Sequence, residues 1–307
     1  MRISETKVVI HNIVHYQQCN FLGRLHGGDM LKLFVDAGMI SSMKVARGKV
    51  VLAELDNVVF KKGINLGDII RVEAEVDYVG KSSLEVQMMA FRGEELMVSA
   101  TGVYVKVDEY QRPVEVQEKV KPIDESEVRR YEEAVKRRER RVRDVPSDID
   151  ETEGLRCRET NTVYVSPELT YDGERMSAGR LLKFMDDLAG SLGLEFIGYS
   201  GHSPTSDATV TVAVSEMGFY SPVRLGDIIQ ITSGIVYVGK TSIGTLANVF
   251  RYNPEDRTTK KVTKAYMVFV RIGPDGKPKE MPTYSPSTDV EKELWEEFIR
   301  RREYKSR

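Results

Sequence analysis

The 307-residue sequence is poor in cysteine, with only Cys19 and Cys157. Two cysteines cannot form the disulfide framework of a small secreted protein, and they are too few for a cysteine metal site. No stretch approaches the roughly 20 apolar residues that a membrane-spanning helix requires. The first residues, MRISETKVVIHN, contain no apolar run suited to a signal peptide. These absences predict a cytoplasmic protein with no membrane span.

A strong net charge is also missing, since 45 basic and 47 acidic side chains leave a formal charge of −2. No overall field therefore favours nucleic acid or an anionic membrane as a partner. The sequence has no G-x-x-x-x-G-K-[ST] loop, no G-x-G-x-x-G fingerprint and no His/Cys cluster with metal spacing. We therefore predict no nucleic-acid partner, no metal and no bound cofactor.

The sequence does contain a long internal repeat. Three pairs of segments match in the same order: 60–92 with 219–251, 100–107 with 265–272, and 131–139 with 295–303. The first pair aligns without a gap and shares LGDII and YVGK. A repeat of roughly 140–150 residues is a duplicated domain, because solenoid units are far shorter. The predicted domains are residues 1–144 and 155–307, each ending in a charged helix, and a linker at 145–154 joins them.

Each copy combines one helical pattern with about four strand patterns. The apolar spacing predicts helices over 29–45 and 181–197. Alternating Val-, Ile- and Tyr-rich runs predict strands over 50–60, 69–79, 83–91 and 97–107, then 209–219, 228–238, 242–252 and 263–272. This is an α+β unit whose sheet must wrap its helix. The charged stretch 124–143 predicts a solvated helix that closes the first copy, or a basic arm that meets ligand phosphates or a partner.

Several motifs resemble one family, the hotdog-fold acyl-CoA thioesterases, and most closely the tandem acyl-CoA hydrolases of the cytosolic long-chain type. They are Asn20-x-x-Gly23-x-x-His26-Gly27-Gly28 leading into a helix, LGD at 66–68, the VGKSS and VGKTS turns, and KFMDDLAG at 183–190. The resemblance implies two hotdog domains, each a long helix wrapped by an antiparallel sheet, paired as an intramolecular pseudo-dimer. It implies a thioester hydrolase of lipid metabolism that converts fatty acyl-CoA to free acid and CoA. It also implies a homo-oligomer, such as a trimer of tandem chains.

The two copies differ where this family has its site. In the family, an amide side chain lies seven residues before the first loop glycine, and an acid lies about eight residues after it. The first copy has Asn20 and Gly27 but Val35 at the acid position. The second copy has Ala178 at the position of Gly27 and Asp186 at the acid position, but Tyr171 at the amide position. Across the interface of the two halves, the copies would build one complete site, and the mirror site should be inactive.

The residues of the complete site would divide the chemistry of thioester hydrolysis. Gly27 and Gly28, at a helix N-terminus, are candidate oxyanion-hole donors, because free N–H groups and the helix dipole favour negative charge there. Asp186 would act as general base or as nucleophile. Asn20 would orient water or the thioester carbonyl, although Asn is also common as a plain turn residue.

Other residues are secondary candidates. His26 either contacts the substrate or packs locally, and Asp187 replaces Asp186 if the helix alignment is wrong by one residue. Because the first copy keeps Asp36 at the position of Asp187, we interpret that acid as structural. Candidate CoA contacts, which could equally be plain hairpin turns, are Lys81, Ser82, Ser83, Lys240, Thr241 and Ser242. Alternative functions are an acyl-CoA sensor or carrier without catalysis, a hotdog hydratase, and hydrolysis of a different thioester.

Overall fold

The contacts in the computed structural model, which describes residues 1–140, 147–201, 203 and 205–305, divide the chain into two compact units. The first comprises Met1–Cys19, Gly23–Leu25 and Asp29–Val145, and the second comprises Asn20–Leu22, His26–Gly28 and Pro146–Arg307. The second unit therefore takes in two short pieces of the first sequence copy. Residues 141–146, which include the end of the predicted charged helix and the start of the predicted linker, lie outside the described residues.

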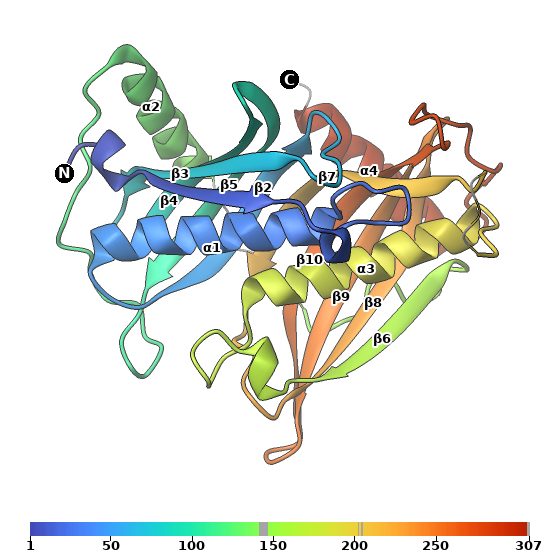
Figure 1. Cartoon of the computed structure of the whole chain (residues 1–307). Coiled ribbons are helices and arrows are strands. Elements are labelled where there is room, and N and C mark those ends of the chain that lie inside the picture. The colour runs from blue at the N-terminus through green and yellow to red at the C-terminus, as the bar shows by residue number, and fades with distance from the viewer. Residues whose placement is uncertain (141–146, 202, 204, 306–307) are drawn as a thin grey trace. The chain divides into compact units, whose positions relative to one another are not determined.

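The first unit is a five-stranded antiparallel sheet with one long helix, α1 (Gly27–Ala46) (Figure 1). Its strands hydrogen-bond in the order β1-β3-β4-β5-β2. Their bounds are β1 Val8–Ile13, β2 Val50–Phe60, β3 Ile69–Val79, β4 Ser83–Arg92 and β5 Glu95–Lys106. The hydroxyl of Tyr104 in β5 donates to the Val35 carbonyl at mid-helix, 3.1 Å away. Both side chains are fully buried, so the core of this unit lies between α1 and the sheet.

The second unit repeats this architecture. Its strands hydrogen-bond in the order β6-β8-β9-β10-β7, all antiparallel. Their bounds are β6 Arg158–Tyr164, β7 Ala208–Phe219, β8 Ile228–Val238, β9 Ser242–Asn253 and β10 Thr258–Ile272. The helix α3 (Ala178–Phe196) contacts all five strands. Short 3-10 helices in the described residues precede β1 (η1, Ser4–Thr6), α1 (η2, Tyr16–Gln18) and α3 (η3, Pro167–Leu169).

The LGD sequence shared by the two copies forms the same turn in each unit. Gly67 has φ +83° and Gly226 has φ +86°, a backbone region that favours glycine. The Asp68 carboxylate accepts the Asn65 N–H at 2.8 Å, as Asp227 accepts the Arg224 N–H at 2.7 Å. These contacts explain the motif as a structural turn before β3 and β8.

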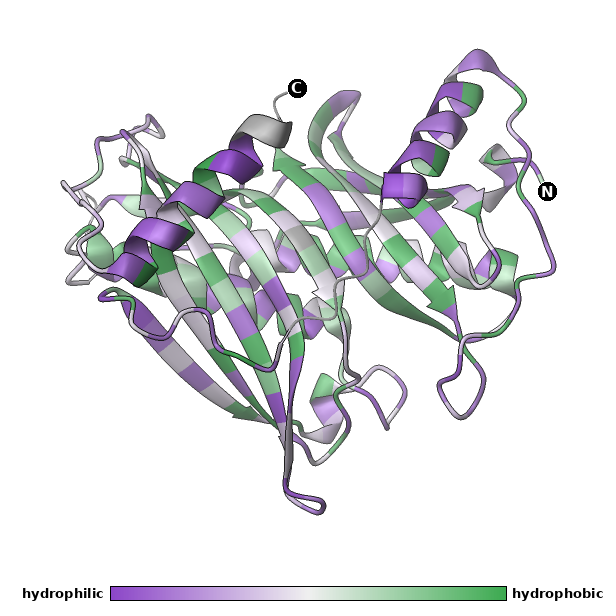
Figure 2. Cartoon of the chain, turned by 180° about the vertical axis from the view of Figure 1, so that it is seen from behind, coloured by the Kyte–Doolittle hydropathy of each residue, from purple (hydrophilic) through white to green (hydrophobic). Residues whose placement is uncertain are grey.

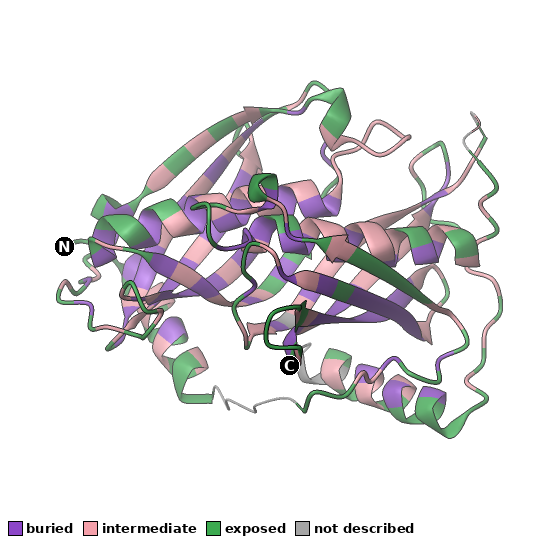
Figure 3. Cartoon of the chain, turned by 90° about the horizontal axis from the view of Figure 1, so that it is seen from below, coloured by how far each residue is buried: buried purple, intermediate pink, exposed green. Residues whose placement is uncertain are grey.

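A charged helix follows the last strand of each unit. The helix α2 (Glu125–Arg140) packs against β3, and α4 (Asp289–Lys305) packs against β8. Figure 2 shows hydrophilic residues along most of α2, and Figure 3 shows exposed residues on both helices. The prediction of a helix over 124–143 is therefore confirmed for its described residues.

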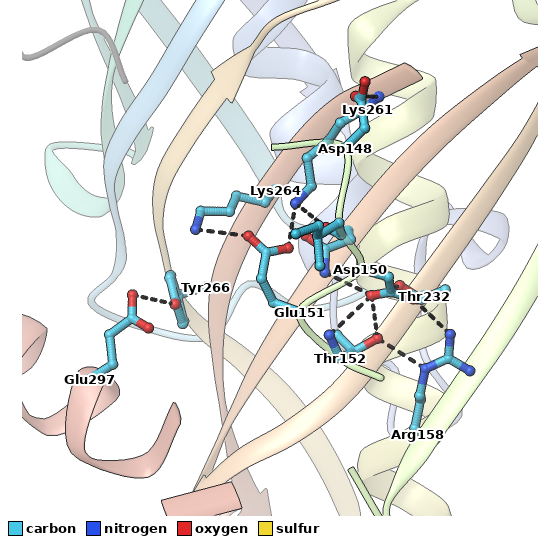
Figure 4. Close-up of polar contacts among 12 residues, drawn as sticks. Asp148, Asp150, Glu151, Thr152, Arg158, Thr232, Lys261, Lys264, Tyr266 and Glu297 are labelled. Atoms are coloured by element: carbon cyan, nitrogen blue, oxygen red, sulfur yellow. Dashed lines mark hydrogen bonds and ion pairs between the residues drawn. The ribbon is translucent and has the colours of Figure 1, made fainter. Parts of the chain in front are cut away.

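The segment that precedes β6 is anchored to the second sheet (Figure 4). The Asp150 carboxylate accepts hydrogen bonds from four side chains, those of Thr152, Arg158, Thr232 and Asn248. The Lys261 ammonium, almost fully buried, pairs with Glu151 and donates to the Ile149 carbonyl at 2.8 Å. Residues 148–152 thus bind β8, β9 and β10 through a polar network.

The predicted α+β class with an antiparallel sheet and a long helix in each half is confirmed. The predicted helices and eight strands are present, with ends that differ by up to five residues. The expectation of about four strands per copy was wrong, because β1 and β6 add a fifth strand at one edge of each sheet.

Candidate active site

Asp186 lies on α3 with no exposed surface. Its Oδ2 accepts the Gly28 N–H at 2.7 Å, and its Oδ1 accepts the Thr211 hydroxyl of β7 at 2.7 Å. Burying a carboxylate is costly unless hydrogen bonds and nearby charge compensate for the lost water. The structure places this acid of the second copy beside the glycine loop of the first copy, within the second unit.

The two glycines allow this close approach. A Cβ at Gly27 would lie 2.4 Å from the Thr211 Oγ1 and 2.9 Å from the Asp186 Oδ2, and one at Gly28 would lie 2.7 Å from the Lys183 Cα. No side chain fits at those distances, so glycine is required at both positions. The Gly28 N–H, expected from sequence to face an oxyanion, is bonded to Asp186 in this structure.

His26 bridges the two adjacent acids of α3. Its Nδ1 lies 3.0 Å from the Asp186 Oδ2, and its Nε2 lies 3.4 Å from the Asp187 Oδ1. Burial lowers the pKa of His26, but the hydrogen bond and charge of Asp186 and the charge of Asp187 outweigh it, so the pKa is raised. Burial raises the pKa of Asp187. The charges of His26 and of Lys183, whose ammonium is 3.5 Å away, lower it but do not cancel the rise.

Asn20 belongs to the same unit as Asp186 but makes a local turn. Its Oδ1 accepts the Leu22 N–H at 3.0 Å, an arrangement typical of turn residues. The neighbouring Phe21 ring stacks on Tyr199, with ring centroids 5.0 Å apart. The loop that carries Asn20 is thus fixed to the segment that follows α3.

The counterpart positions carry different groups. Val35 is fully buried in the core of the first unit. The Tyr171 hydroxyl accepts from the Arg175 guanidinium at 3.1 Å, and burial raises its pKa. Ser177 caps α3 by accepting the Arg180 N–H at 3.4 Å. The first copy thus has a buried apolar side chain, Val35, at the position where the second copy has the Asp186 carboxylate.

Thr211 was not among the residues expected from sequence. Its position could have been found from the strand register. Thr211 pairs with Phe269 in β10, and Leu52 pairs with Tyr104 in β5. The aligned segments 100–107 and 265–272 make these positions equivalent. A hydroxyl therefore replaces an apolar side chain only in the copy that carries the acid.

The candidate CoA contacts lie in two hairpin turns. The Gly80 N–H bonds the Ser83 carbonyl at 2.8 Å, and the Gly239 N–H bonds the Ser242 carbonyl at 2.7 Å. The Lys240 ammonium is exposed and lies 3.6 Å from Glu280. Backbone carbonyls in the turns accept from adjoining segments at Lys81, Ser82, Lys240 and Thr241. Lys240 also lines a shallow pocket of about 280 Å³ with residues 280–284.

Over residues 1–140, 147–201, 203 and 205–305, no group of three or more His, Cys, Asp or Glu side chains could hold a metal ion. None of the helices in the described part of the chain is long and apolar enough to cross a membrane.

The family model described as the thioesterase superfamily matches this chain twice, at residues 22–99 and 174–257. The chain belongs to that superfamily, and its two units are hotdog domains. It is 25% identical to the cytosolic acyl coenzyme A thioester hydrolase of Rattus norvegicus, over 97% of this chain and 85% of that protein. It is 32% identical to an uncharacterized acyl-CoA thioester hydrolase of Bacillus subtilis, over 43% of this chain and 80% of that protein.

A solved structure supports the tandem fold. The crystal structure of a putative oleoyl thioesterase from Lactobacillus plantarum matches 90% of this chain and 97% of its own, with a TM-score of 0.60. Sequence identity is 11%, so this likeness speaks for the fold alone. The predicted tandem hotdog thioesterase is therefore confirmed as a class.

Proposed function

We propose that this protein hydrolyses fatty acyl-CoA to a free acid and CoA at one site centred on Asp186. The superfamily and the full-length relatives named acyl-CoA thioester hydrolases support this activity. The observation that carries the site is the fully buried Asp186 carboxylate beside the glycine loop at the start of α1. Buried ionisable groups with specific partners are concentrated at functional sites.

In this proposal Asp186 is a general base. Both of its oxygens already accept hydrogen bonds, so attack by either oxygen on the thioester would compete with Gly28 or Thr211. A water beside Thr211 instead gives a proton to Asp186 while the water oxygen bonds to the carbonyl carbon. The C–S bond then breaks, its electron pair goes to sulfur, and the proton passes from Asp186 to the CoA thiolate.

The remaining groups prepare the carbonyl. The N-terminus of α1, with the Gly27 N–H, is the proposed donor to the developing oxyanion, because the helix dipole favours negative charge there. Asn20 orients the water or the thioester, and the turns that contain Lys81 and Lys240 are the proposed contacts of CoA. The mirror position, with Tyr171 and Val35, lacks the acid and is inactive in this proposal.

The proposed location and assembly follow those of the relatives and the family. Their names place them in the cytosol, which supports the same location here. We also propose that whole chains associate into a homo-oligomer, with a trimer of tandem chains as the assembly that the family resemblance suggests.

The test is thiol release from a panel of short- to long-chain acyl-CoAs by the wild type and Asp186→Asn. We expect the variant to lose at least about a hundredfold in kcat, the usual scale of a lost general base. Asp36→Asn on α1, a half-buried acid paired with Lys32 at 2.8 Å, is the matched control and should keep wild-type turnover. Thermal unfolding of each variant checks the fold.

Other outcomes identify the alternatives. Binding of acyl-CoA by the wild type without thiol release would support a sensor or carrier. The proximity of His26 to Asp186 makes a hydratase the second candidate, since that chemistry uses a histidine and an acid together. Loss of enoyl-thioester absorbance without thiol release would identify it. Full activity of Asp186→Asn would move the assignment to Asp187.

A further inference from the structure

His26 occupies a position where a different residue would suit the helix better. It directly precedes α1, as Ser177 precedes α3 and caps it. Serine is a favoured N-cap because its hydroxyl accepts a free N–H of the first turn, whereas histidine is not among the favoured N-cap residues. A local preference that is broken at a site indicates a functional requirement.

The hydrogen bonds around His26 define which of its nitrogens carries a proton. The Gly28 N–H lies 2.7 Å from the Asp186 Oδ2 and 3.3 Å from the His26 Nδ1. The shorter contact assigns this N–H to Asp186. The Nδ1 atom cannot both accept from Gly28 and donate to Asp186, so at 3.0 Å from Asp186 it is a donor. On the other side of the ring, Nε2 faces a second carboxylate, that of Asp187.

The charges around His26 also favour its protonated form. The charged side chains that face His26 are Asp186, Asp187 and Lys183, all on α3. With a protonated His26, the four groups carry two negative and two positive charges. Without that proton, the fully buried Asp186 would lose the positive charge next to it, and a buried carboxylate without a partner is strongly unfavourable.

We propose that His26 is a positioning residue: held by Asp187, it donates to the Asp186 Oδ2 and keeps that carboxylate ionised, with Oδ1 turned toward Thr211. This inference rests on the proposed function of Asp186 as general base. His26 keeps its proton throughout, so the proton of the attacking water still passes to Asp186 and then to the CoA thiolate.

The duplicated sequence supplies an internal comparison. Both copies keep a lysine–aspartate pair four residues apart on the long helix, Lys32 with Asp36 and Lys183 with Asp187. Only the second of these aspartates faces a histidine. The copy that retains the catalytic acid has Ser177 at the histidine position, and the copy that has His26 lacks the acid. The histidine therefore occurs where it serves the acid of the other copy.

The experiment uses the full chain and three variants. His26→Ser introduces the residue that already caps α3, Asp187→Asn removes the carboxylate that holds the ring, and Asp36→Asn is the matched control. We would measure kcat and KM with the best acyl-CoA of the panel from about pH 5 to about pH 9. Thermal unfolding would be followed for each variant.

We expect His26→Ser to lower kcat at neutral pH by at least about tenfold, as loss of a positioning partner does. KM should change by less than about threefold, because uniform binding is kept. The acid limb of kcat should move to higher pH, so that part of the loss is recovered in alkali. Asp187→Asn should act in the same direction but less strongly, and Asp36→Asn should match the wild type.

Two results would overturn the inference: wild-type kcat in His26→Ser, or a loss that is equal at every pH. If the wild type releases no thiol from any acyl-CoA, the proposed function fails, and NMR titration of the histidines decides the inference separately. The resonance lost in His26→Ser should titrate above the ordinary value of about 6.5. The pKa measured from this resonance should be lower in Asp187→Asn than in the wild type. A resonance that titrates normally and is unchanged in Asp187→Asn would contradict the contact of His26 with both acids.

Discussion

At the scale of single residues, the hydroxyl of Thr211 distinguishes the two copies. It donates to the Asp186 Oδ1 at 2.7 Å, whereas the equivalent Leu52 is a core residue of the first unit. Thr209, two residues earlier on the same face of β7, donates to the Gly190 carbonyl at 3.1 Å and does not serve the acid in this way. Thr211 therefore contacts the catalytic acid, whereas Thr209 contacts the backbone of the helix, and comparing the two tests the contact to the acid.

Thr211→Val should keep the shape of the side chain and remove its hydrogen bond. A hydrogen bond to a charged group contributes about 1.5–3 kcal/mol, so we expect kcat to fall by roughly ten- to a hundredfold. Thr209→Val is the matched control and should stay within about twofold. Steady-state thiol release by both variants measures this. Equal losses in the two variants would show that β7 contributes packing and no specific contact to Asp186.

Part of the site could be predicted from sequence at this scale. Counting from Gly27 and from Ala178 singled out Asp186, because a duplicated chain keeps its helix register. The contact of His26 with both acids and the role of Thr211 could not be found by counting. They depend on which side chains the fold brings together from a loop, a helix and a strand. The Gly28 N–H was also expected to be free for an oxyanion, and its bond to Asp186 appears only in three dimensions.

At the scale of elements, α2 and α4 pack at equivalent positions on their sheets through different kinds of contact. The α4 helix packs apolar and aromatic side chains, with Phe298 stacked on Tyr237 at a centroid distance of 5.1 Å. The residue equivalent to Phe298 in α2 is Ala134. On α2, Arg137 instead pairs with the buried Glu85 at 2.7 Å. The first copy thus replaces an apolar contact with ion pairs between its helix and its sheet.

Asp77 of β3 is the element-scale site where pH should matter. Burial raises the pKa of Asp77 to about 7, and Arg130, at 3.1 Å, limits the rise. Because the folded-state pKa lies above that of the unfolded chain, the folded state binds the extra proton between about pH 4 and about pH 7. The contribution of this group to the free energy of unfolding therefore falls as pH rises through that window.

Asp77→Asn should remove this dependence. Relative to the wild type, the variant should gain stability on going from about pH 5 to about pH 8, by on the order of a few kcal/mol. Arg130 keeps a partner in the variant, because Glu75 lies 2.7 Å from its guanidinium. Urea unfolding of both proteins at several pH values gives the difference. A difference that is constant with pH would mean that Asp77 titrates normally in the folded protein.

The elements that sequence missed are the edge strands. β6, with the sequence RETNTVY, exposes most of its side chains, and β1 has six residues. An edge strand pairs on one side only and can do without the apolar pattern of a central strand. The central strands were found because both copies repeat their alternation. The sequence also predicts only a linker at 145–154. The polar network of residues 148–152 could not be predicted, because the partners Thr232, Asn248 and Lys261 lie far away in the sequence.

At the scale of the whole molecule, duplication has allowed the copies to diverge in complementary ways. The first retains Asn20, His26 and the glycine loop, and the second retains the acid and its threonine. Residues 20–22 and 26–28 belong to the second unit by their contacts, although the rest of their copy forms the first. If Asp186 works with Asn20 and the glycine loop as proposed, catalysis needs residues of both copies, and equivalent positions in the two copies should respond differently to the same substitution.

Asn20→Ala and Tyr171→Ala test this asymmetry at one pair of equivalent positions. Loss of Asn20 should lower kcat/KM by about a hundredfold, the scale of one lost donor at a developing charge. Loss of Tyr171 should leave turnover within about twofold, because its contacts to Arg175 are structural and no acid lies at its partner position. Thiol release and thermal unfolding of both variants would be compared. If Tyr171→Ala loses more than about tenfold while remaining as stable as the wild type, both copies contribute working sites, and the divergence has a different cause.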